Sequence, residues 1–279
     1  MEYETETQNT SSDSQSQESV SMVDETGIKT YVEILDVSIN VRALKNFVNQ
    51  LSVVNDECVI QIDPIDGLIV RLVDAAHVAM VETRLAIEVF EDWKYMPANA
   101  YIGKFGLNLD KMNAYLKGFG AKSLDDILRL NIDLVKMIMT IHAPNGERVM
   151  SLLDAEHMSN PKMPQLNLGT HITVHDAKSW RRMLKDSREI SDYITIRYDQ
   201  DKNQVFLESA NETDKIQTIL DSTVDVECGN ENSKYSLEYL IDLSKVLPNG
   251  FKIELGTDYP IKLTYGATRI LLAPRIESE

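Results

Sequence analysis

The chain has 279 residues, of which 43% are hydrophobic, so it is long enough to bury the core of one large domain or two medium ones. No run of about 18 apolar residues is present, which excludes a membrane-spanning helix, and residues 1–29 lack the apolar region of a signal peptide. Two cysteines, Cys58 and Cys228, are too few for a disulfide framework or a zinc site. We therefore expect a cytoplasmic protein with reduced thiols.

The formal net charge of −16 runs against the basic footprint that is typical of tight DNA binders. Two interpretations stay open. The first is an acidic soluble protein that never meets nucleic acid. The second is an acidic body with a local basic face, which would hold DNA loosely and without sequence preference.

Residues 1–29 are rich in Ser, Thr, Gln and Glu and poor in apolar side chains. Seven acidic residues stand against the single base Lys29, and such a segment cannot bury enough surface to offset the entropy of ordering it. We predict a disordered acidic tail over 1–29.

A regular pattern begins at Tyr31. Apolar residues spaced by three and four predict a helix over 37–51: Val37, Val41, Leu44, Val48 and Leu51. Two apolar runs, 58–62 and 68–73, flank a turn that contains Pro64 and Gly67, which predicts a hairpin.

The same unit returns about 135 residues downstream, and repeats of long period bear directly on the fold. Its members are a helix over 174–190, a strand over 193–197, a turn over 199–203 and a strand over 205–209. Weaker copies are a helix over 109–119 with strands 126–132 and 135–141, and a helix over 237–247 with strands 251–255 and 261–265.

Four such units predict an α+β protein of two similar domains, 30–153 and 168–277, with helices on one face of antiparallel sheets. The bridge between them, 154–167, contains Pro161 and Pro164, which exclude a regular helix or a central strand. We expect an extended surface connector there.

Basic residues gather on the predicted helices. One helix face carries Lys178, Arg181, Arg182, Lys185 and Arg188, with Asp176 and Asp186 off this stripe and Trp180, Met183 and Leu184 on a neighbouring stripe that would pack on the sheet. A solvated charged face and a DNA-facing surface both explain it. The repeat favours the second, because it would bring all four helices to a common side.

No catalytic or metal site stands out. His77 has no partner pattern, His171 and His175 lie in an apparent strand, and the Gly-rich phosphate loops and nucleophile motifs are missing. Carboxylates are not clustered in an apolar setting. We expect no catalytic residue, no metal and no cofactor.

Several short segments, in this order, carry a resemblance: Asp66-Gly67-Leu68 before residues 73–81, Gly106-Leu107-Asn108-Leu109, Ala143-Pro144-Asn145, and Leu272-Ala273-Pro274-Arg275-Ile276 after the strand 261–265. Over about residues 31–276 the sequence resembles the proliferating cell nuclear antigen (PCNA) family of DNA sliding clamps. Residues 74–80 look like the archaeal form.

The resemblance implies a clamp fold in a ring of three subunits, with helices around a central hole and antiparallel sheets outside. Double-stranded DNA would be held independently of sequence in replication and repair. The acidic charge would lie outside, and the implied DNA-facing residues are Arg42, Lys45, Lys111, Lys117, Lys178, Arg181, Arg182, Lys185 and Lys245.

The resemblance also implies a pocket for short motifs with a glutamine, an aliphatic residue and two aromatics, carried by DNA polymerase, the clamp loader, flap nuclease and DNA ligase. An apolar cleft suits aromatic anchors. The implied pocket residues are His77, Val78, Met80, Pro161, Pro164, Pro260, Leu271, Leu272, Ala273 and Pro274. Leu271 departs from the aromatic residue common in eukaryotic clamps, and core packing is the alternative for Val78, Met80 and Leu272.

A homotrimer would close through edge strands at 137–141 and 216–220, with Met137, Met139, Ile141, Ile216 and Ile219 at the subunit interface. A clamp-like subunit that works only in a hetero-oligomeric ring is one alternative. An acidic enzyme of duplicated α+β architecture is another, and it requires a concave site with perturbed titrating groups.

Overall fold

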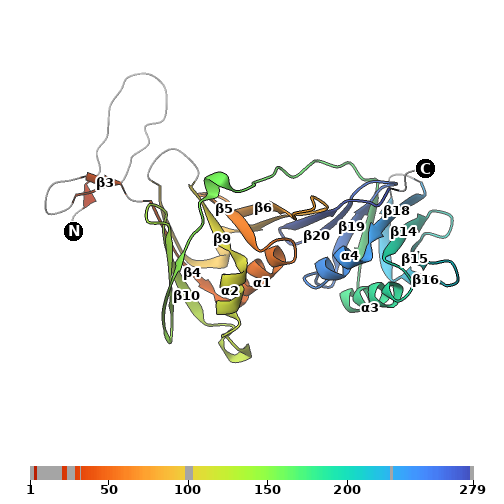
Figure 1. The fold of residues 1–279 in the computed structure, drawn as a ribbon, viewed down its shortest axis with the longest axis horizontal. Helices are drawn as coiled ribbons and strands as arrows, with labels where there is room; N and C mark the ends of the chain where they lie inside the picture. The colour runs from red at the N-terminus through yellow and green to blue at the C-terminus, as the bar shows by residue number, and fades with distance from the viewer. Residues whose placement is uncertain are drawn as a thin grey trace, which may run out of the picture. The chain divides into compact units, whose positions relative to one another are not determined.

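The computed structural model describes residues 3–4, 21–23, 29–31, 33–97, 103–226 and 229–276. The chain divides into two compact units, which are described separately (Figure 1). The first comprises Met1–Val48, Asp56–Val70 and Arg84–Asn160, and the second Asn49–Asn55, Arg71–Thr83 and Pro161–Glu279. The domain boundaries given above stay a prediction.

Three short strands near the N-terminus pair with one another: β1 (Tyr3–Glu4), β2 (Ser21–Val23) and β3 (Lys29–Tyr31). The other positions of 1–32 lie outside the described residues. The disordered acidic tail therefore remains a prediction.

The first unit is built on antiparallel strands. One sheet has the order β12-β11-β10-β4-β8: Gly146–Ser151, Ile138–Ala143, Ile127–Asp133, Ile34–Asn40 and Phe90–Met96. A second group runs β9-β5-β6: Gly103–Asn108, Glu57–Asp63 and Gly67–Val73. Helices α1 (Val41–Ser52) and α2 (Leu109–Leu116) carry buried apolar faces, which include Leu44, Val48 and Met112. Short 3-10 turns span Ile87–Val89, Ala121–Ser123 and Ala155–His157.

The second unit repeats this plan. Strands β17-β13-β19-β20-β21-β7 form one sheet: Ser222–Val226, Thr170–Val174, Phe251–Leu255, Ile261–Tyr265, Thr268–Leu272 and Ala79–Leu85. Strands β16-β15-β14-β18 form the other: Lys215–Leu220, Gln204–Ala210, Tyr193–Asp199 and Glu231–Ser236. Helices α3 (Ala177–Arg188) and α4 (Leu237–Ser244) pack against them, and Trp180 of α3 meets the Phe251 ring edge-on at 5.7 Å.

Two predicted helix starts were wrong for the same reason. The helix expected over 37–51 begins at Val41, and Val37 belongs to β4, where Leu35, Val37 and Ile39 alternate into the core. The helix expected over 174–190 begins at Ala177 after the N-cap Asp176. A strand that runs straight into a helix leaves apolar spacings of four across the junction, which resemble one longer helix.

The predicted duplication is confirmed. The hairpin β5–β6 has its counterpart in β14–β15, and strands 251–255 and 261–265 lie where the sequence put them. Residues 158–169 form no helix or strand, as expected for a connector. Among the described residues, no helix is long and apolar enough to cross a membrane. Cys58 is buried and unbridged, burial raises its pKa to about 12, and Cys228 lies outside the described residues.

Candidate functional site

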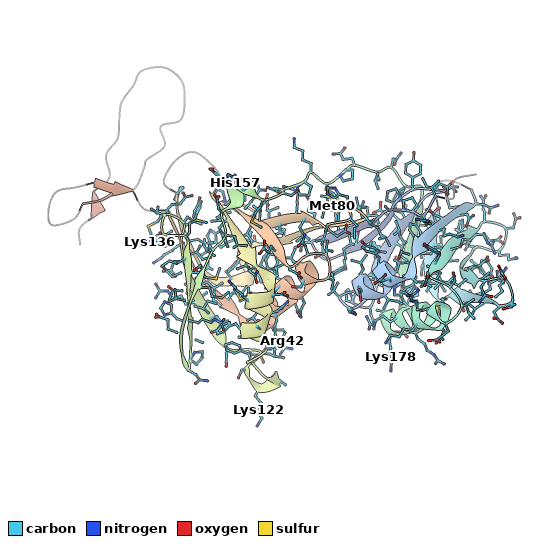
Figure 2. The ribbon with its side chains drawn as sticks, in the orientation of Figure 1. Arg42, Met80, Lys122, Lys136, His157 and Lys178 are labelled. Carbon is cyan, nitrogen blue, oxygen red and sulfur yellow. The ribbon has the colours of Figure 1, made fainter. Side chains whose placement is uncertain are left out.

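The exposed face of α3 carries basic side chains. Ala177, Trp180, Leu184 and Ser187 are buried, which leaves Lys178, Arg182 and Lys185 exposed. Lys178 points away from its unit (Figure 2). Asp186 does affect this face, contrary to the sequence prediction: its carboxylate lies 3.7 Å from the Arg182 guanidinium, because residues four apart meet on a helix.

Arg181 turns from this face toward the neighbouring helix. Its Nη1 donates to the carbonyls of Ser244 (3.1 Å) and Leu247 (3.0 Å), just where α4 ends. The last carbonyls of a helix have no partner within the helix, so a cation there satisfies them and complements the helix dipole. Arg181 therefore closes the end of α4, a role that its place on the stripe did not reveal.

Lys45 makes a similar contact in the first unit. It is the fifth residue of α1, as Arg181 is of α3, and its Nζ donates to the carbonyl of Phe119 at 3.0 Å, beyond the end of α2. The duplication thus uses equivalent positions to join each pair of helices. Both cations were predicted to face DNA, and both are engaged within the protein.

The remaining predicted basic residues fall into two groups. Arg42, Arg182 and Lys245 form surface ion pairs with Asp125 (2.9 Å), Asp186 (3.7 Å) and Asp242 (2.5 Å). Of the predicted DNA-facing residues, four are exposed lysines that form no ion pair within the described part of the chain: Lys111, Lys117, Lys178 and Lys185. In the first unit, Figure 2 shows Lys122, which the sequence analysis did not select, pointing outward beyond α2. A sequence-blind phosphate surface needs mobile cations of this kind.

The predicted docking residues begin with a loop that one carboxylate holds together. Asp74, only 7% exposed, directly follows β6 and accepts hydrogen bonds from the backbone N–H groups of Ala76 (3.1 Å), Val78 (2.7 Å) and Ala79 (2.7 Å). The Tyr239 hydroxyl of α4 donates to it at 2.7 Å. Burial opposes ionisation, but these hydrogen bonds outweigh it and lower the pKa of Asp74. Within this loop His77 is exposed to solvent, and its backbone has a positive φ of 58°.

The C-terminal tail lies beside this loop. The Ala273 N–H donates to the Val78 carbonyl at 2.8 Å, and the Arg275 N–H donates to the Lys234 carbonyl at 2.7 Å. Pro274 is half-buried, as are Pro161 and Pro260, whereas Pro164 is exposed. The tail is thus fixed by the loop before β7 and by strand β18, both in its own unit.

Leu271 and Leu272 point to opposite faces of β21. Leu271 pairs with Met80 of β7, and Leu272 pairs with Ala79 and is fully buried. Neighbouring strand residues alternate between faces, so the two cannot line one pocket. The full burial of Leu272 favours core packing, the alternative that the sequence left open for it, and its place in a pocket stays a prediction.

A groove of about 620 Å³ lies on the Leu271 side of this sheet. Its wall is residues 162–166 of the connector, and its floor is Leu271 with four charged side chains: Arg71, Glu82, Lys262 and Arg269. Of the predicted docking residues, Pro164 and Leu271 line it. The charged floor was missed, although Arg269 and Leu271 are two apart on a strand and must share a face.

The predicted edge strand of the first unit needs correction. Strand β11, which holds Met139 and Ile141, pairs on both sides, with β10 and β12, and both side chains are buried. Met137 precedes it at a φ of 55°. The edge of this sheet is β12, on which Val149 is 57% exposed. The hairpin partner 146–151 was overlooked because its polar residues hide the strand pattern.

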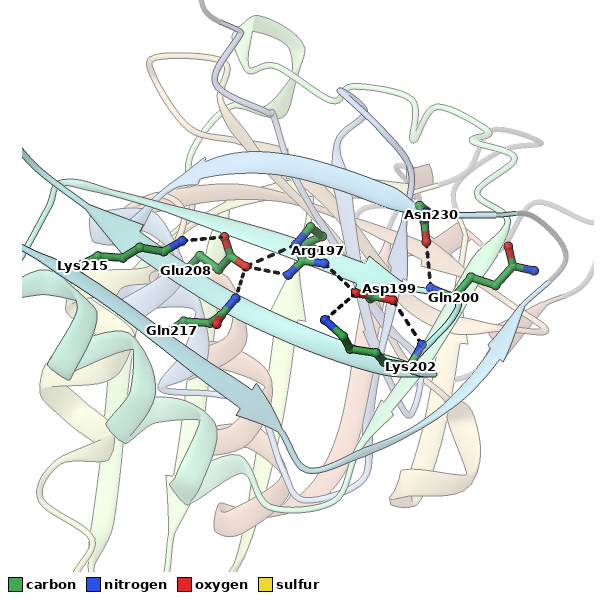
Figure 3. Close-up of polar contacts among 8 residues, drawn as sticks. All are labelled: Arg197, Asp199, Gln200, Lys202, Glu208, Lys215, Gln217 and Asn230. Atoms are coloured by element: carbon green, nitrogen blue, oxygen red, sulfur yellow. Dashed lines mark hydrogen bonds and ion pairs between the residues drawn. The ribbon is translucent and has the colours of Figure 1, made fainter.

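The predicted edge at 216–220 is confirmed as an edge. Strand β16 ends its sheet, Ile216 is half-buried and Ile219 is 52% exposed. A polar network ties β16 inward (Figure 3): Glu208 of β15 accepts from Arg197 of β14 at 2.8 Å and from Gln217 of β16 at 2.5 Å. Burial opposes the ionisation of Glu208, but these bonds lower its pKa.

The two histidines that are four residues apart lie in and directly after strand β13. His175 Nε2 lies 2.8 Å from the Thr223 hydroxyl, and His171 is in β13. Within the described ranges, no cluster of three or more His, Cys, Asp or Glu side chains could hold a metal ion.

Paired helices over antiparallel sheets, repeated within the chain, define the PCNA-like clamp fold. The structure matches an archaeal PCNA, solved as the C-terminal region of FEN-1 bound to A. fulgidus PCNA, with a TM-score of 0.75 and 25% identity over 88% of this chain and 100% of that one. It also matches the PCNA of Thermococcus kodakaraensis, with a TM-score of 0.74 and 19% identity over 86% of this chain and 100% of that one.

Sequence relatives agree with the fold. The chain is 31% identical to the DNA polymerase sliding clamp of Methanococcoides burtonii, over 87% of this chain and 98% of the relative. It is 29% identical to that of Halobacterium salinarum strain R1, over 84% and 96% of the two chains. No family model matches the sequence. The chain belongs to the DNA polymerase sliding clamp family.

Proposed function

We propose that this chain assembles as a homotrimeric ring around duplex DNA and acts there as a processivity factor, without chemistry of its own. The observation that carries the proposal is its likeness to sliding clamps over almost their whole length. These relatives are named DNA polymerase sliding clamps, and we propose the same function for this chain. The ring would work in the cytoplasm, on DNA.

The charge distribution fits this function. A ring holds DNA topologically, so its inner surface needs only weak contacts with phosphates, which carry no sequence information. We assign these contacts to Lys111, Lys117, Lys178 and Lys185, with Arg42, Arg182 and Lys245 held partly by their ion pairs.

Partner enzymes would dock through short peptides on the surface around His77, Met80 and Leu271. The related A. fulgidus PCNA was solved with the C-terminal region of FEN-1, which supports peptide docking by a flap nuclease. DNA polymerase, the clamp loader and DNA ligase are proposed to use the same surface, where apolar side chains suit aromatic anchors.

The subunits would join through the edges β12 and β16, whose exposed Val149 and Ile219 leave apolar surface for a neighbour. Light scattering on a sizing column tests this assembly. We expect a mass three times the 31.6 kDa of one chain. Ile219→Asp should yield smaller species, and a wild-type monomer at micromolar concentration would contradict the homotrimer.

DNA contact is tested by polymerase processivity on primed circular DNA. We replace Lys111, Lys117, Lys178 and Lys185 together by Gln and expect stimulation to be reduced and to depend less steeply on salt than in the wild type, because fewer phosphate contacts release fewer counterions. The matched control replaces four exposed lysines on strands or turns: Lys94, Lys104, Lys136 and Lys252. Equal losses in both variants would contradict the assignment to the helices.

A further inference from the structure

The groove beside Leu271 combines an apolar end with a charged end. Leu271 pairs with Met80 across β21 and β7, and two residues along the same strands Arg269 pairs with Glu82. Arg269 and Leu271 lie on one face because strand side chains alternate. A peptide anchored at Leu271 would therefore continue over the charged residues.

The charged end is basic, in contrast to the chain as a whole. The groove is lined by four cations, Arg71, Lys162, Lys262 and Arg269, and by the carboxylate of Glu82. Glu254 adds a second carboxylate, because it pairs with Lys262 at 2.8 Å. The local balance is four positive charges against two negative ones, on a chain whose formal net charge is −16.

Glu82 does not neutralise this end. Its Oε2 accepts from Arg71 Nε at 2.5 Å and its Oε1 from Arg269 Nη1 at 3.2 Å, so one carboxylate holds two guanidinium groups side by side. A guanidinium has five N–H donors, and the side chain of Arg269 is 56% exposed. Lys162 is exposed on the opposite wall and forms no ion pair within the described residues. Both cations can therefore meet a ligand.

We infer that this groove selects partner peptides whose docking motif is flanked by acidic residues. The inference rests on the proposed docking function and adds the charge of the partner. The aromatic anchors sit against Leu271 and the apolar connector residues of the groove, and carboxylates beside them meet Arg269 and Lys162. Arginine in a groove of this kind binds carboxylates through paired N–H donors.

The test is fluorescence anisotropy of three labelled peptides on the full chain. All share a glutamine, an aliphatic residue and two aromatics, and their flanks on both sides are acidic, neutral or basic. Two solvent-accessible charge contacts predict that the acidic peptide binds about fivefold tighter than the neutral one at low salt, less at high salt, with the basic peptide weakest.

Variants locate the effect. Lys162→Gln with Arg269→Gln should make the acidic and neutral peptides bind equally, whereas Lys94→Gln with Lys104→Gln, which loses the same charge on strands of the first unit, should keep the acidic preference. Glu82→Gln removes the groove's lining carboxylate and should raise the preference. Equal binding of the acidic and neutral peptides overturns the charge inference and leaves docking intact. Failure of all three peptides to bind overturns docking, and the inference with it.

Discussion

The segment 34–78 and its repeat, 170–214, follow the same course of strand, helix, hairpin and loop, and they differ in how the final loop is held. Asp74 directly follows β6, and Asn211 directly follows β15, each after a strand of seven residues. Both side chains accept backbone N–H groups from the loop: Asn211 accepts from Thr213 at 2.8 Å and Asp214 at 2.6 Å.

The difference lies in burial and in the partner beyond the loop. Asp74 is a nearly buried carboxylate bound to the Tyr239 hydroxyl of α4, whereas Asn211 is an exposed amide whose Nδ2 donates to the Ile190 carbonyl at 3.1 Å. The loop assigned to docking is thus anchored to a helix by a charge, and its counterpart by weaker neutral bonds. The two side chains occupy equivalent positions in the repeat, but Asp74 holds its loop more strongly than Asn211 does.

The largest effect that this comparison predicts is on stability. Asp74→Ala leaves three loop N–H groups and the Tyr239 hydroxyl without their acceptor, and should lower the free energy of unfolding by about 3 kcal/mol. The matched change Asn211→Ala, at an exposed site, should cost about 1 kcal/mol or less. Urea unfolding measures both, and equal losses would refute the distinction between the loops.

The repeats differ again where a cation closes a neighbouring helix. Arg181 donates two hydrogen bonds to carbonyls at and beyond the end of α4, and Lys45 donates one beyond α2. Arg181→Ala should therefore cost about 2 kcal/mol and Lys45→Ala about 1 kcal/mol. Lys178→Ala, at an exposed site of α3, is the control and should change stability little. A larger loss for Lys45→Ala would reverse the ranking.

Much of this architecture was readable from the sequence, because the hairpins and the second halves of the helices carry clear apolar periods. The starts of α1 and α3 were misplaced, since Val37 and Val174 continue the helical spacing backwards into strands. Strand β12 was missed because Gly146–Ser151 exposes most of its side chains.

The site was less predictable. The spacing of basic residues along a helix shows which face a side chain is on, but not which group it binds. Lys45 and Arg181 lie on the basic faces, yet both bind main-chain carbonyls beyond the end of another helix, which only tertiary packing decides. Leu272 was assigned to the pocket from the family resemblance, without regard to the alternation of side chains along its strand. Arg71 and Glu82 meet across two strands, a proximity that no spacing along the chain encodes.

Tyr239 tests the part of the comparison that is unique to one loop. Tyr239→Phe removes one hydrogen bond to Asp74 and leaves the three backbone donors, so we expect a loss of about 1 kcal/mol. The control Tyr259→Phe changes a side chain that is 54% exposed and should be nearly neutral. A Tyr239→Phe variant as stable as the wild type would mean that α4 does not help to anchor the loop.

Acid gives the finest test, because Asp74 carries a titrating carboxylate where its counterpart Asn211 carries an amide. Folding lowers the pKa of Asp74, since hydrogen bonds from Ala79, Tyr239, Val78 and Ala76 together outweigh the opposing effect of burial. The stability gained from this carboxylate is then complete above its unfolded pKa of about 3.9 and is lost as pH falls through the lower folded value. Asp74→Asn does not titrate, so the stability difference between wild type and variant should be constant near neutral pH and shrink under acid. Urea unfolding of both proteins across that range measures it, and a difference that grows as pH falls would show that Asp74 is protonated more easily in the folded protein.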